Sequence, residues 1–410
     1  MKKIVIVASG TKGDVQPAVA LSSYLRKKNY DVLICGGLNI RELAEEHDCP
    51  FIPVGEDNEK FVARAPDPSQ QPIRATKALT NYVINEMKLQ FEYLPQIAKD
   101  TDLILSVTFG LGGATVAELL NKPYGYIGFC PQILPSDEHP ALFVKSHRHS
   151  KFTNRLSWVF HKKLFNFSYR AFINENRKRF ALAPVSDCWD HVIGNRVLLA
   201  CDQEYSMVPS DVKQQCYQTG YLSIAQESDM DDRLMTFIDS GAAPIYIGFG
   251  SMTASEPGKT TKIVTEAAKL ANQRLVLASG WANLGADNLN QHSCYVVGKI
   301  SHNFLFPKMA AVIHHGGSGT VATAARAGKP QMIVPHMTDQ FYFAEQVPKT
   351  GVATQSIWRK HLTPQNLAAA IRRLVKDQEL KYNSEVLRNK LLNHDSFKLA
   401  EKHIREHFMD

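Results

Sequence analysis

Short apolar runs alternate with amphipathic segments along the whole chain. In the first half the runs are Ile4–Ala8, Val32–Cys35, Leu103–Val107 and Tyr124–Phe129, and we expect each to be a buried β-strand. The second half has five more runs: Ile245–Phe249, Leu275–Ala278, Tyr295–Val297, Ala311–His314 and Met332–Val334. The segments between them carry helical spacing, as in Val15–Lys28. This alternation predicts parallel sheets covered by helices on both faces.

The pattern restarts near residue 244, which predicts two α/β domains, each a doubly wound sheet, facing a central cleft. We place the first domain at residues 1–208 and the second at 233–380. Residues 209–232 contain Pro209, Gly220 and an acidic stretch, and we interpret them as a linker. The long polar helical stretch at 381–410 is expected to pack back toward the first domain.

Composition narrows the class of protein. The 410 residues carry a formal charge of +7 without a Lys/Arg-rich tract, which argues against a nucleic-acid partner and is compatible with an anionic one. The seven cysteines form no Cys-x-x-Cys pair, which is typical of reduced thiols in a cytoplasmic protein. No apolar run reaches the length of a membrane span, and the opening run is too short for a signal peptide.

Residues 312 to 320 carry the strongest local signal. An apolar run ends in His314 and His315, three glycines and two hydroxyl residues follow, and a helix is expected at Val321–Ala327. A strand, a glycine-rich turn and a helix N-terminus present backbone N–H groups to an anion, and glycine lets that anion approach closely. His315 adds a donor that can be neutral or cationic. We expect a phosphate-binding turn here.

The ordered set of motifs resembles the GT-B glycosyltransferases of family 1, in the branch of the sterol and antibiotic glycosyltransferases. The carriers are Gly10-Thr11-Lys12-Gly13-Asp14-Val15-Gln16-Pro17, Phe249-Gly250-Ser251, Ser279-Gly280-Trp281, Phe304-Leu305-Phe306-Pro307, His314 to Thr320, and Pro335 to Gln340. The resemblance touches both ends of the chain and covers most of residues 244 to 350. It implies a GT-B fold and a nucleotide-sugar donor.

The resemblance also implies roles in donor binding. The diphosphate would be held by His315, Ser318, Gly319 and Thr320, with Ser251 on the opposite loop. Asp339 and Gln340 would receive the sugar hydroxyls, and Trp281 would stack on the base. The alternatives are a helix cap for the pair and a core indole for Trp281. The donor set is completed by Thr11, Gly13 and Gly317.

Asp14 is the candidate catalytic base. It follows the glycine turn after the first strand, where the resembling family carries a histidine or aspartate base, and a carboxylate there can accept the proton of the acceptor hydroxyl. A helix N-cap explains the same residue without catalysis. For the acceptor side the sequence offers only Phe109, Pro135 and His139 as candidates.

Residues 143 to 180 combine many lysines and arginines with aromatic residues, and we expect them to be helical. Such a segment can lie on an anionic membrane surface. The interpretation that we favour from sequence is a pair of ordinary helices, with an apolar face in the acceptor pocket and a basic face in solvent.

Together these features predict an inverting enzyme that moves a hexose, glucose first, from a UDP-sugar to a hydroxyl of an apolar acceptor such as a sterol, polyketide or flavonoid. No cofactor and no metal are expected, because Asp229-Met230-Asp231 lies in the linker rather than at a strand end. The alternatives are a non-catalytic nucleotide-sugar-binding partner protein and, less favoured, a nucleotide-sugar epimerase.

Overall fold

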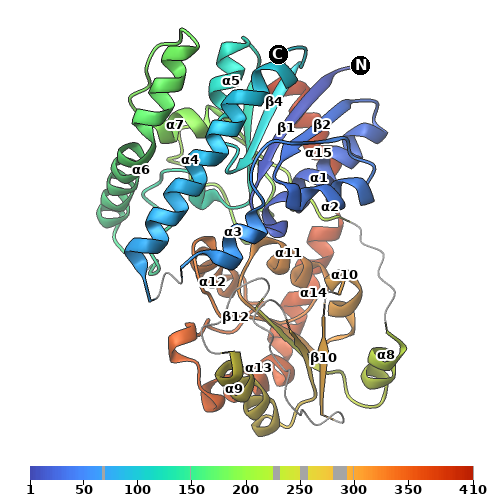
Figure 1. Cartoon of the computed structure of the whole chain (residues 1–410). Helices are drawn as coiled ribbons and strands as arrows, with labels where there is room; N and C mark the ends of the chain where they lie inside the picture. Colours follow the sequence, from blue (N-terminus) through green and yellow to red (C-terminus); the bar gives the residue numbers. More distant parts are fainter. Residues whose placement is uncertain are drawn as a thin grey trace.

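A computed structural model describes residues 1–66, 70–147, 149–224, 231–249, 257–279, 293–298 and 300–409 of the chain. Within these residues the strands form two fully parallel sheets, one in each lobe of the molecule (Figure 1). The order in the first sheet is β3-β2-β1-β4-β5-β6-β7, and in the second it is β10-β9-β8-β11-β12. The predicted α/β class with two doubly wound sheets is therefore confirmed.

The strands of the N-terminal lobe are β1 (Lys3–Ser9), β2 (Asp31–Gly36), β3 (Phe51–Pro53), β4 (Leu103–Thr108), β5 (Tyr124–Gly128), β6 (Arg196–Leu199) and β7 (Gln215–Gln218). Those of the C-terminal lobe are β8 (Ile245–Gly248), β9 (Leu275–Ala278), β10 (Cys294–Val297), β11 (Ala311–His314) and β12 (Gln331–Ile333).

The helices of the N-terminal lobe are α1 (Lys12–Lys27), α2 (Arg41–Glu46), α3 (Asn58–Arg64), α4 (Pro72–Ile97), α5 (Gly113–Leu119), α6 (Lys151–Arg179) and α7 (Cys188–Ile193), with short 3₁₀ turns at Leu38–Ile40 and Pro131–Ile133. The later helices are α8 (Asp232–Asp239), α9 (Pro257–Leu270), α10 (His302–Leu305), α11 (Ser318–Arg326), α12 (Asp339–Lys349), α13 (Pro364–Lys376), α14 (Gln378–Leu392) and α15 (Ser396–His403). Further 3₁₀ turns lie at Phe306–Lys308 and Arg359–His361, and a π-helical turn at Ile404–Phe408.

Strand β1 shows why the first sheet is covered on both sides. Ile4 and Ile6 join a buried cluster with α1, whereas the alternate residues Val5 and Val7 join a second cluster with α4 and α6. Successive side chains of a strand point to opposite faces, so a strand buried on both faces needs a continuous apolar run. Burial on both faces therefore explains the continuous apolar run Ile4–Ala8, from which this strand was predicted.

Every strand predicted from an apolar run is present, but three short strands were missed. β3 and β7 are edge strands whose side chains stay partly exposed. β6 lies in the apolar run Val197–Cys201, which the prediction did not use. β7 lies inside the segment interpreted as a linker, and this part of the interpretation is wrong, because Gln215–Gln218 pairs with β6. An edge strand with polar ends leaves no apolar run to detect.

The end of the chain returns to the N-terminal lobe (Figure 1). The predicted continuous helix is interrupted after Leu392, and α15 follows. Ile404 and Phe408 are buried in the same cluster as Ile4, and Phe408 packs under β5, where a Cβ added to Gly125 would lie 2.3 Å from its ring. The domain boundaries given above otherwise stay a prediction.

Candidate functional site

The turn after β1 folds the Asp14 carboxylate back over the backbone. The φ angle of Gly10 is +150°, and a Cβ added there would lie 2.8 Å from the Cβ of Asp14, so only glycine fits this position. The Oδ2 atom of Asp14 accepts hydrogen bonds from the backbone N–H and the hydroxyl of Thr11, each at 2.8 Å. Thr11 is the N-cap of α1 and Asp14 lies in its first turn, so the two residues form a capping box.

This geometry changes one of the two explanations offered for Asp14. Thr11, rather than Asp14, is the N-cap of α1. Only Oδ2 takes part in the capping box, and Oδ1 makes no hydrogen bond with the described residues. The same carboxylate can therefore support the helix with one oxygen and accept a proton with the other.

Burial raises the pKa of the Asp14 carboxyl above its ordinary value, against the two hydrogen bonds from Thr11. Burial also raises the pKa of Asp339 to about 6, and the nearby negative charge of Asp14 acts in the same direction. The charge of a carboxylate in one lobe thus acts on a carboxylate of the other lobe. A pair of titratable groups with perturbed pKa values is typical of a functional site.

The turn after β11 uses its two histidines differently. His314 is fully buried: its Nδ1 accepts the N–H of Gly316 at 3.1 Å, and its Nε2 lies 3.0 Å from Oε1 of Gln331. His314 therefore fixes the shape of the turn. His315 turns toward Gly317, where an added Cβ would lie 2.6 Å from its Nε2, and its Nδ1 has no hydrogen-bond partner among the described residues.

Burial lowers the pKa of the His315 imidazole to about 3, and the neighbouring His314 and His336 act in the same direction. The neutral ring is therefore the form present at neutral pH, rather than the cation that the sequence left open. A buried nitrogen without a partner beside a helix N-terminus is a costly arrangement that a bound hydrogen-bonding ligand would relieve.

Helix α11 begins with Ser318, directly after this turn. Its N-cap is Gly317, which offers no side-chain acceptor, and the N–H groups of Thr320 and Val321 both turn to the carbonyl of Gly317. The first N–H groups of a helix have no partner within it, so they are available to an anion at this end. Ser318, Gly319 and Thr320 are all partly exposed.

Tyr221 reaches this helix end from the other lobe, and sequence reasoning missed it. A Cβ added to Gly319 would lie 2.6 Å from the Tyr221 hydroxyl, although the Tyr221 side chain is almost fully buried. Burial is the main cause of its raised pKa, and the charges of Arg326, Asp202 and Asp14 also act on it. The phenol hydroxyl thus lies beside the N-terminus of α11, and the charge of Asp14 acts on it.

Helix α12 begins with the predicted pair of sugar-binding residues. Thr338 precedes it with a φ angle of +42°, which is strained for a β-branched residue, and its hydroxyl donates to Oδ1 of Asp339 at 2.9 Å. The side-chain carbonyl of Gln340 accepts the N–H groups of His336 at 2.8 Å and Met337 at 3.1 Å. That oxygen therefore shapes the preceding loop, which the expectation for Gln340 did not foresee.

An ion pair behind α11 joins the two lobes. Arg326, the last residue of α11, binds both carboxylate oxygens of Asp202 at 2.7 Å, and the Tyr205 hydroxyl donates to the same carboxylate at 2.5 Å. Asp202 also accepts the backbone N–H of Tyr221. Asp202 is buried and follows β6, so the pair ties the candidate phosphate helix to the N-terminal sheet.

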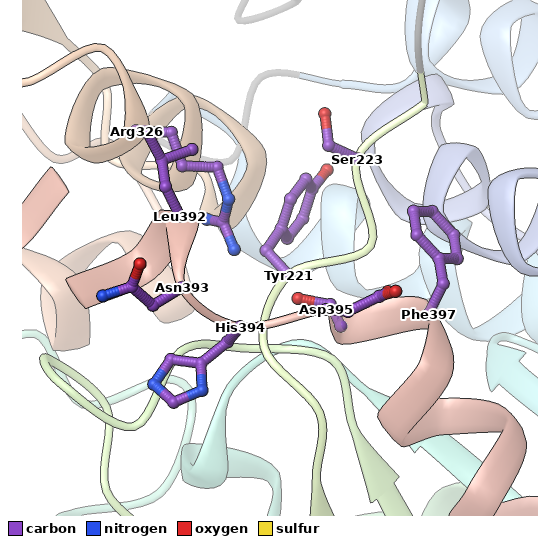
Figure 2. Close-up of a pocket in the computed structure, with 9 residues that line it drawn as sticks. Tyr221, Ser223, Arg326, Leu392, Asn393, His394, Asp395 and Phe397 are labelled. Atoms are coloured by element: carbon purple, nitrogen blue, oxygen red, sulfur yellow. The ribbon is translucent and has the colours of Figure 1, made fainter. Parts of the chain in front are cut away.

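Figure 2 shows the open pocket of about 370 Å³ beside this ion pair. Tyr221 and Ser223 border it on one side and Arg326 on another, and His394 and Asp395 come from the turn between α14 and α15. The pocket therefore lies where the chain passes between lobes. It is distinct from the N-terminal end of α11, where the anion is expected.

The acceptor candidates lie in the N-terminal lobe. Phe109 follows β4, is partly exposed, and packs edge-on against Tyr82 with ring centroids 5.8 Å apart. Pro135 is partly exposed. His139 is buried between Trp158 and Tyr342, and Nε2 of its ring has no partner. Phe109 is therefore accessible to an acceptor, whereas the His139 side chain is buried.

Some candidates cannot be placed. Ser251 and Trp281 lie outside the described residues, as do Asp229 and Met230 of the acidic linker motif. The third residue of that motif, Asp231, caps α8 and accepts the Tyr295 hydroxyl at 2.6 Å. Gly13, the remaining candidate, is exposed in the first turn of α1.

Glu86 is a second group that sequence reasoning missed. Its side chain is fully buried in α4, Oε1 accepts the N–H of Glu56, and Oε2 has no hydrogen-bond partner in the described part of the chain. Burial raises its pKa. A carboxylate inside a helical pattern looks like a solvated residue in sequence, so no local signal could have found it.

The fold and the paired turns define a class of protein. Two parallel sheets, with a carboxylate after the first strand of one and a glycine-rich helix start in the other, are typical of the GT-B glycosyltransferases. Residues 4–131 match the glycosyltransferase family 28 N-terminal domain, and residues 287–398 match the erythromycin biosynthesis protein CIII-like C-terminal domain.

Curated relatives belong to the same class of glycosyltransferases. The chain is 30% identical to a vancomycin aglycone glucosyltransferase of Amycolatopsis orientalis, over 85% of this chain and 84% of the relative. It is 29% identical to sterol 3-beta-glucosyltransferase UGT80B1 of Arabidopsis thaliana, over 90% of this chain and 62% of the relative. The chain belongs to the family 1 glycosyltransferases with the GT-B fold, related to the glycopeptide-antibiotic and sterol glucosyltransferases.

Solved structures share the fold. The spinosyn forosaminyltransferase SpnP superposes with a TM-score of 0.73 over all of both chains at 15% identity. The glycosyltransferase VinC, solved in complex with dTDP, gives a TM-score of 0.69 over 98% of both chains at 16% identity. These structures support the fold, and the curated relatives show that the protein is a glycosyltransferase. No helix among the described residues is long and apolar enough to cross a membrane.

Proposed function

We propose that this protein is an inverting transferase that moves glucose from UDP-glucose to a hydroxyl of an apolar acceptor. The observation that carries the proposal is the Asp14 carboxylate. One of its oxygens makes no hydrogen bond with the described residues, its pKa is raised, and its charge acts on Asp339 of the other lobe. A general base works best when its pKa approaches the working pH. The names of relatives, a vancomycin aglycone and a sterol glucosyltransferase, support glucose and an apolar acceptor.

In the proposed reaction the acceptor oxygen bonds to the anomeric carbon as the bond from that carbon to the diphosphate breaks. The acceptor proton passes to Oδ1 of Asp14, and the configuration at the anomeric carbon is inverted in this single displacement. Thr11 holds Asp14 in place through Oδ2, so the receiving oxygen is oriented before the substrate arrives.

The departing diphosphate gains negative charge, and the donors proposed to stabilise it are the first N–H groups of α11 with Ser318 and Thr320. His315 would donate to the same diphosphate from its neutral ring. Asp339 would accept sugar hydroxyls with its carboxylate, while Gln340 would contribute through its amide nitrogen. Ser251 and Trp281 are proposed to complete the donor site.

The test uses the purified chain alone. It is incubated with UDP-glucose, other UDP-hexoses or dTDP-glucose, and with a pool of sterol, polyketide and flavonoid alcohols, and products are detected by mass. We expect transfer from UDP-glucose to an apolar alcohol, with the product of inverted configuration and with activity retained in excess chelator. Transfer from dTDP-glucose alone would show that the proposed donor nucleotide is wrong. Donor binding without transfer or hydrolysis would favour the non-catalytic partner protein.

A further inference from the structure

The outward face of α6 is apolar. Six large apolar side chains are more than two-fifths exposed there, and the aromatic ones are the most exposed, with Phe152 at 67%, Phe160 at 59% and Phe167 at 87%. Their spacing of three or four residues places them on one side of the helix. We call this set the α6 stripe: Phe152, Leu156, Val159, Phe160, Leu164 and Phe167.

The stripe is not the side of α6 that packs on the core. Trp158, Tyr169 and Ile173 face inward and are buried against the N-terminal sheet. The favoured sequence interpretation, two helices with an apolar face inward and a basic face in solvent, is therefore wrong. The segment from Lys151 to Arg179 is one helix, with buried side chains on its inner side and the α6 stripe on its outer side.

Charge on the exposed side is positive. Lys163 and Arg170 are exposed beside the stripe and have no ion-pair partner in the described part of the chain. Four other basic residues of the helix are paired: Lys151 with Glu138, Arg155 with Asp137, Lys162 with Asp187 and Asp190, and Arg177 with Glu118. Lys178 and Arg179 are exposed at the C-terminal end of the helix, beyond the stripe. The exposed apolar stripe thus has two exposed cations beside it. Helix α6 itself lies on the outer edge of the N-terminal lobe (Figure 1).

We propose that the α6 stripe docks on the surface of an anionic lipid bilayer. An interfacial helix buries its apolar face about 5–10 Å into the boundary between headgroups and acyl chains. The three phenylalanines would enter that boundary, and Lys163 and Arg170 would meet the anionic headgroups. The stripe spans about 22 Å along a straight helix, so it can lie flat on a surface.

A second copy of this chain fits the same stripe less well. A twofold dimer places the same patch on both subunits, so Lys163 and Arg170 of one copy would face those of the other. No acidic side chain lies within the stripe to offset that repulsion. An anionic bilayer satisfies both the apolar residues and the cations, and for this reason it is the partner that we propose.

The stripe also adjoins the junction of the lobes. Phe143 contacts Phe160 edge-on, with ring centroids 5.9 Å apart, and His147, four residues later, contacts Tyr342 of α12 at 6.0 Å. Helix α12 begins with Asp339. A bilayer bound at the stripe would therefore lie beside the segment that reaches the candidate sugar site, although docking itself does not depend on the proposed function.

The test is co-sedimentation of the full chain with vesicles of phosphatidylcholine alone, or of phosphatidylcholine and phosphatidylserine in equal amounts. We expect binding to the mixed vesicles at low salt, little binding to phosphatidylcholine alone, and release from the mixed vesicles at high salt. Phe152→Ser with Phe167→Ser, and separately Lys163→Glu with Arg170→Glu, should each weaken binding at least tenfold.

Matched controls are Tyr382→Ser, which removes a ring that is 70% exposed on α14, and Lys390→Glu with Lys398→Glu, which makes the same charge change on exposed helix positions. Both should bind as the parent does, and circular dichroism should show every variant folded. Absence of binding to mixed vesicles at low salt would overturn the proposal. So would binding that the α6 variants leave unchanged, or dimerisation without vesicle binding that the phenylalanine variant abolishes.

Discussion

Single residues in this site serve structure and chemistry at once. Asp14 supports the start of α1 through Oδ2, and its Oδ1 makes no hydrogen bond with the described residues. His314 shapes the turn after β11, whereas Nδ1 of the adjacent His315 has no partner among the described residues. Burial disfavours the charged form of each group. It therefore raises the pKa of the Asp14 and Asp339 carboxyls and lowers the pKa of the His315 imidazole. Three predictions follow from these residues.

Replacement of Asp14 by Asn should lower the transfer rate by about a hundredfold or more, because a positioned base typically contributes about a hundredfold to ten-thousandfold. Donor affinity and folding should change little, since Asn keeps an oxygen that can accept from Thr11. In the parent, kcat/KM should fall as the pH drops through the raised pKa of Asp14, above the range of an ordinary carboxylate. A folded Asn variant that retains most of its activity would exclude Asp14 as the base.

Replacement of Asp339 by Ala should separate the sugar from the nucleotide. The change removes an acceptor for sugar hydroxyls and leaves the start of α11 untouched, so UDP should bind nearly as before while UDP-glucose binding and transfer fall strongly. Isothermal titration with UDP and with UDP-glucose measures both. Equal weakening of the two ligands would show that Asp339 acts only as a support for α12.

The pKa of Asp339 also predicts how stability depends on pH. The folded-state pKa of about 6 lies above the ordinary value of about 3.9, so between these limits the folded state binds more protons than the unfolded state. The contribution of this group to stability must therefore decrease as the pH rises from 4 to 6. Asp339→Asn should be more stable than the parent at pH 7, and that difference in melting temperature should vanish near pH 4. An unchanged difference at both pH values would contradict the raised pKa.

At the scale of elements, two strand-to-helix turns from different lobes converge. The turn from β1 to α1 presents Asp14, and the turn from β11 to α11 presents His315 and the helix N-terminus. The Tyr221 hydroxyl lies directly beside Gly319, so a methyl group added at Gly319 would clash with it.

Gly319→Ala should therefore weaken donor binding and cost about 1–3 kcal/mol of unfolding free energy through overpacking. The added Cβ would lie 2.6 Å from the Tyr221 hydroxyl, so the double variant with Tyr221→Phe should recover much of both losses. A double-mutant cycle with UDP binding and urea unfolding measures the coupling. Additive effects of the two substitutions would mean that the contact does not limit the site.

At the scale of the whole molecule, the lobes are joined by a shared core and a buried ion pair. Cys130 and Tyr205 of the N-terminal lobe pack with Val321, Tyr342 and Phe343 of the other lobe. Asp202 and Arg326, 124 residues apart, add a bidentate pair to that core. The position of α11 relative to Asp14 depends on these contacts rather than on either sheet alone.

Arg326→Met should destabilise the protein by about 3–5 kcal/mol, because Asp202 would remain buried without its counter-charge. Adding Asp202→Asn should restore part of that loss. The control is Arg373→Met on α13, which breaks an exposed pair with Asp377 and should cost at most about 1 kcal/mol. Calorimetric unfolding of the four proteins is the measurement, and equal effects of the two arginine changes would contradict a buried interlobe role.

The sequence by itself determined the two parallel sheets, nine of the described strands, the phosphate-type turn at His315 and the family. These features rest on continuous apolar runs and short motifs. Such patterns can be recognised in the sequence because each involves residues only a few positions apart. The candidates Asp14, His315 and Asp339 were found this way, and their catalytic and binding roles stay predictions.

Only the tertiary structure decided which side of α6 faces solvent and which oxygen of Asp14 is occupied. It also decided that Tyr221 lies against Gly319, that Glu86 is buried, and that Asp202 pairs with Arg326. The burial of a side chain, its pKa and its contacts depend on residues far apart in the chain. The sequence around Arg326 therefore does not show whether its side chain is solvated or paired. The edge strand β7 was missed for the related reason that half-exposed strands need no apolar run.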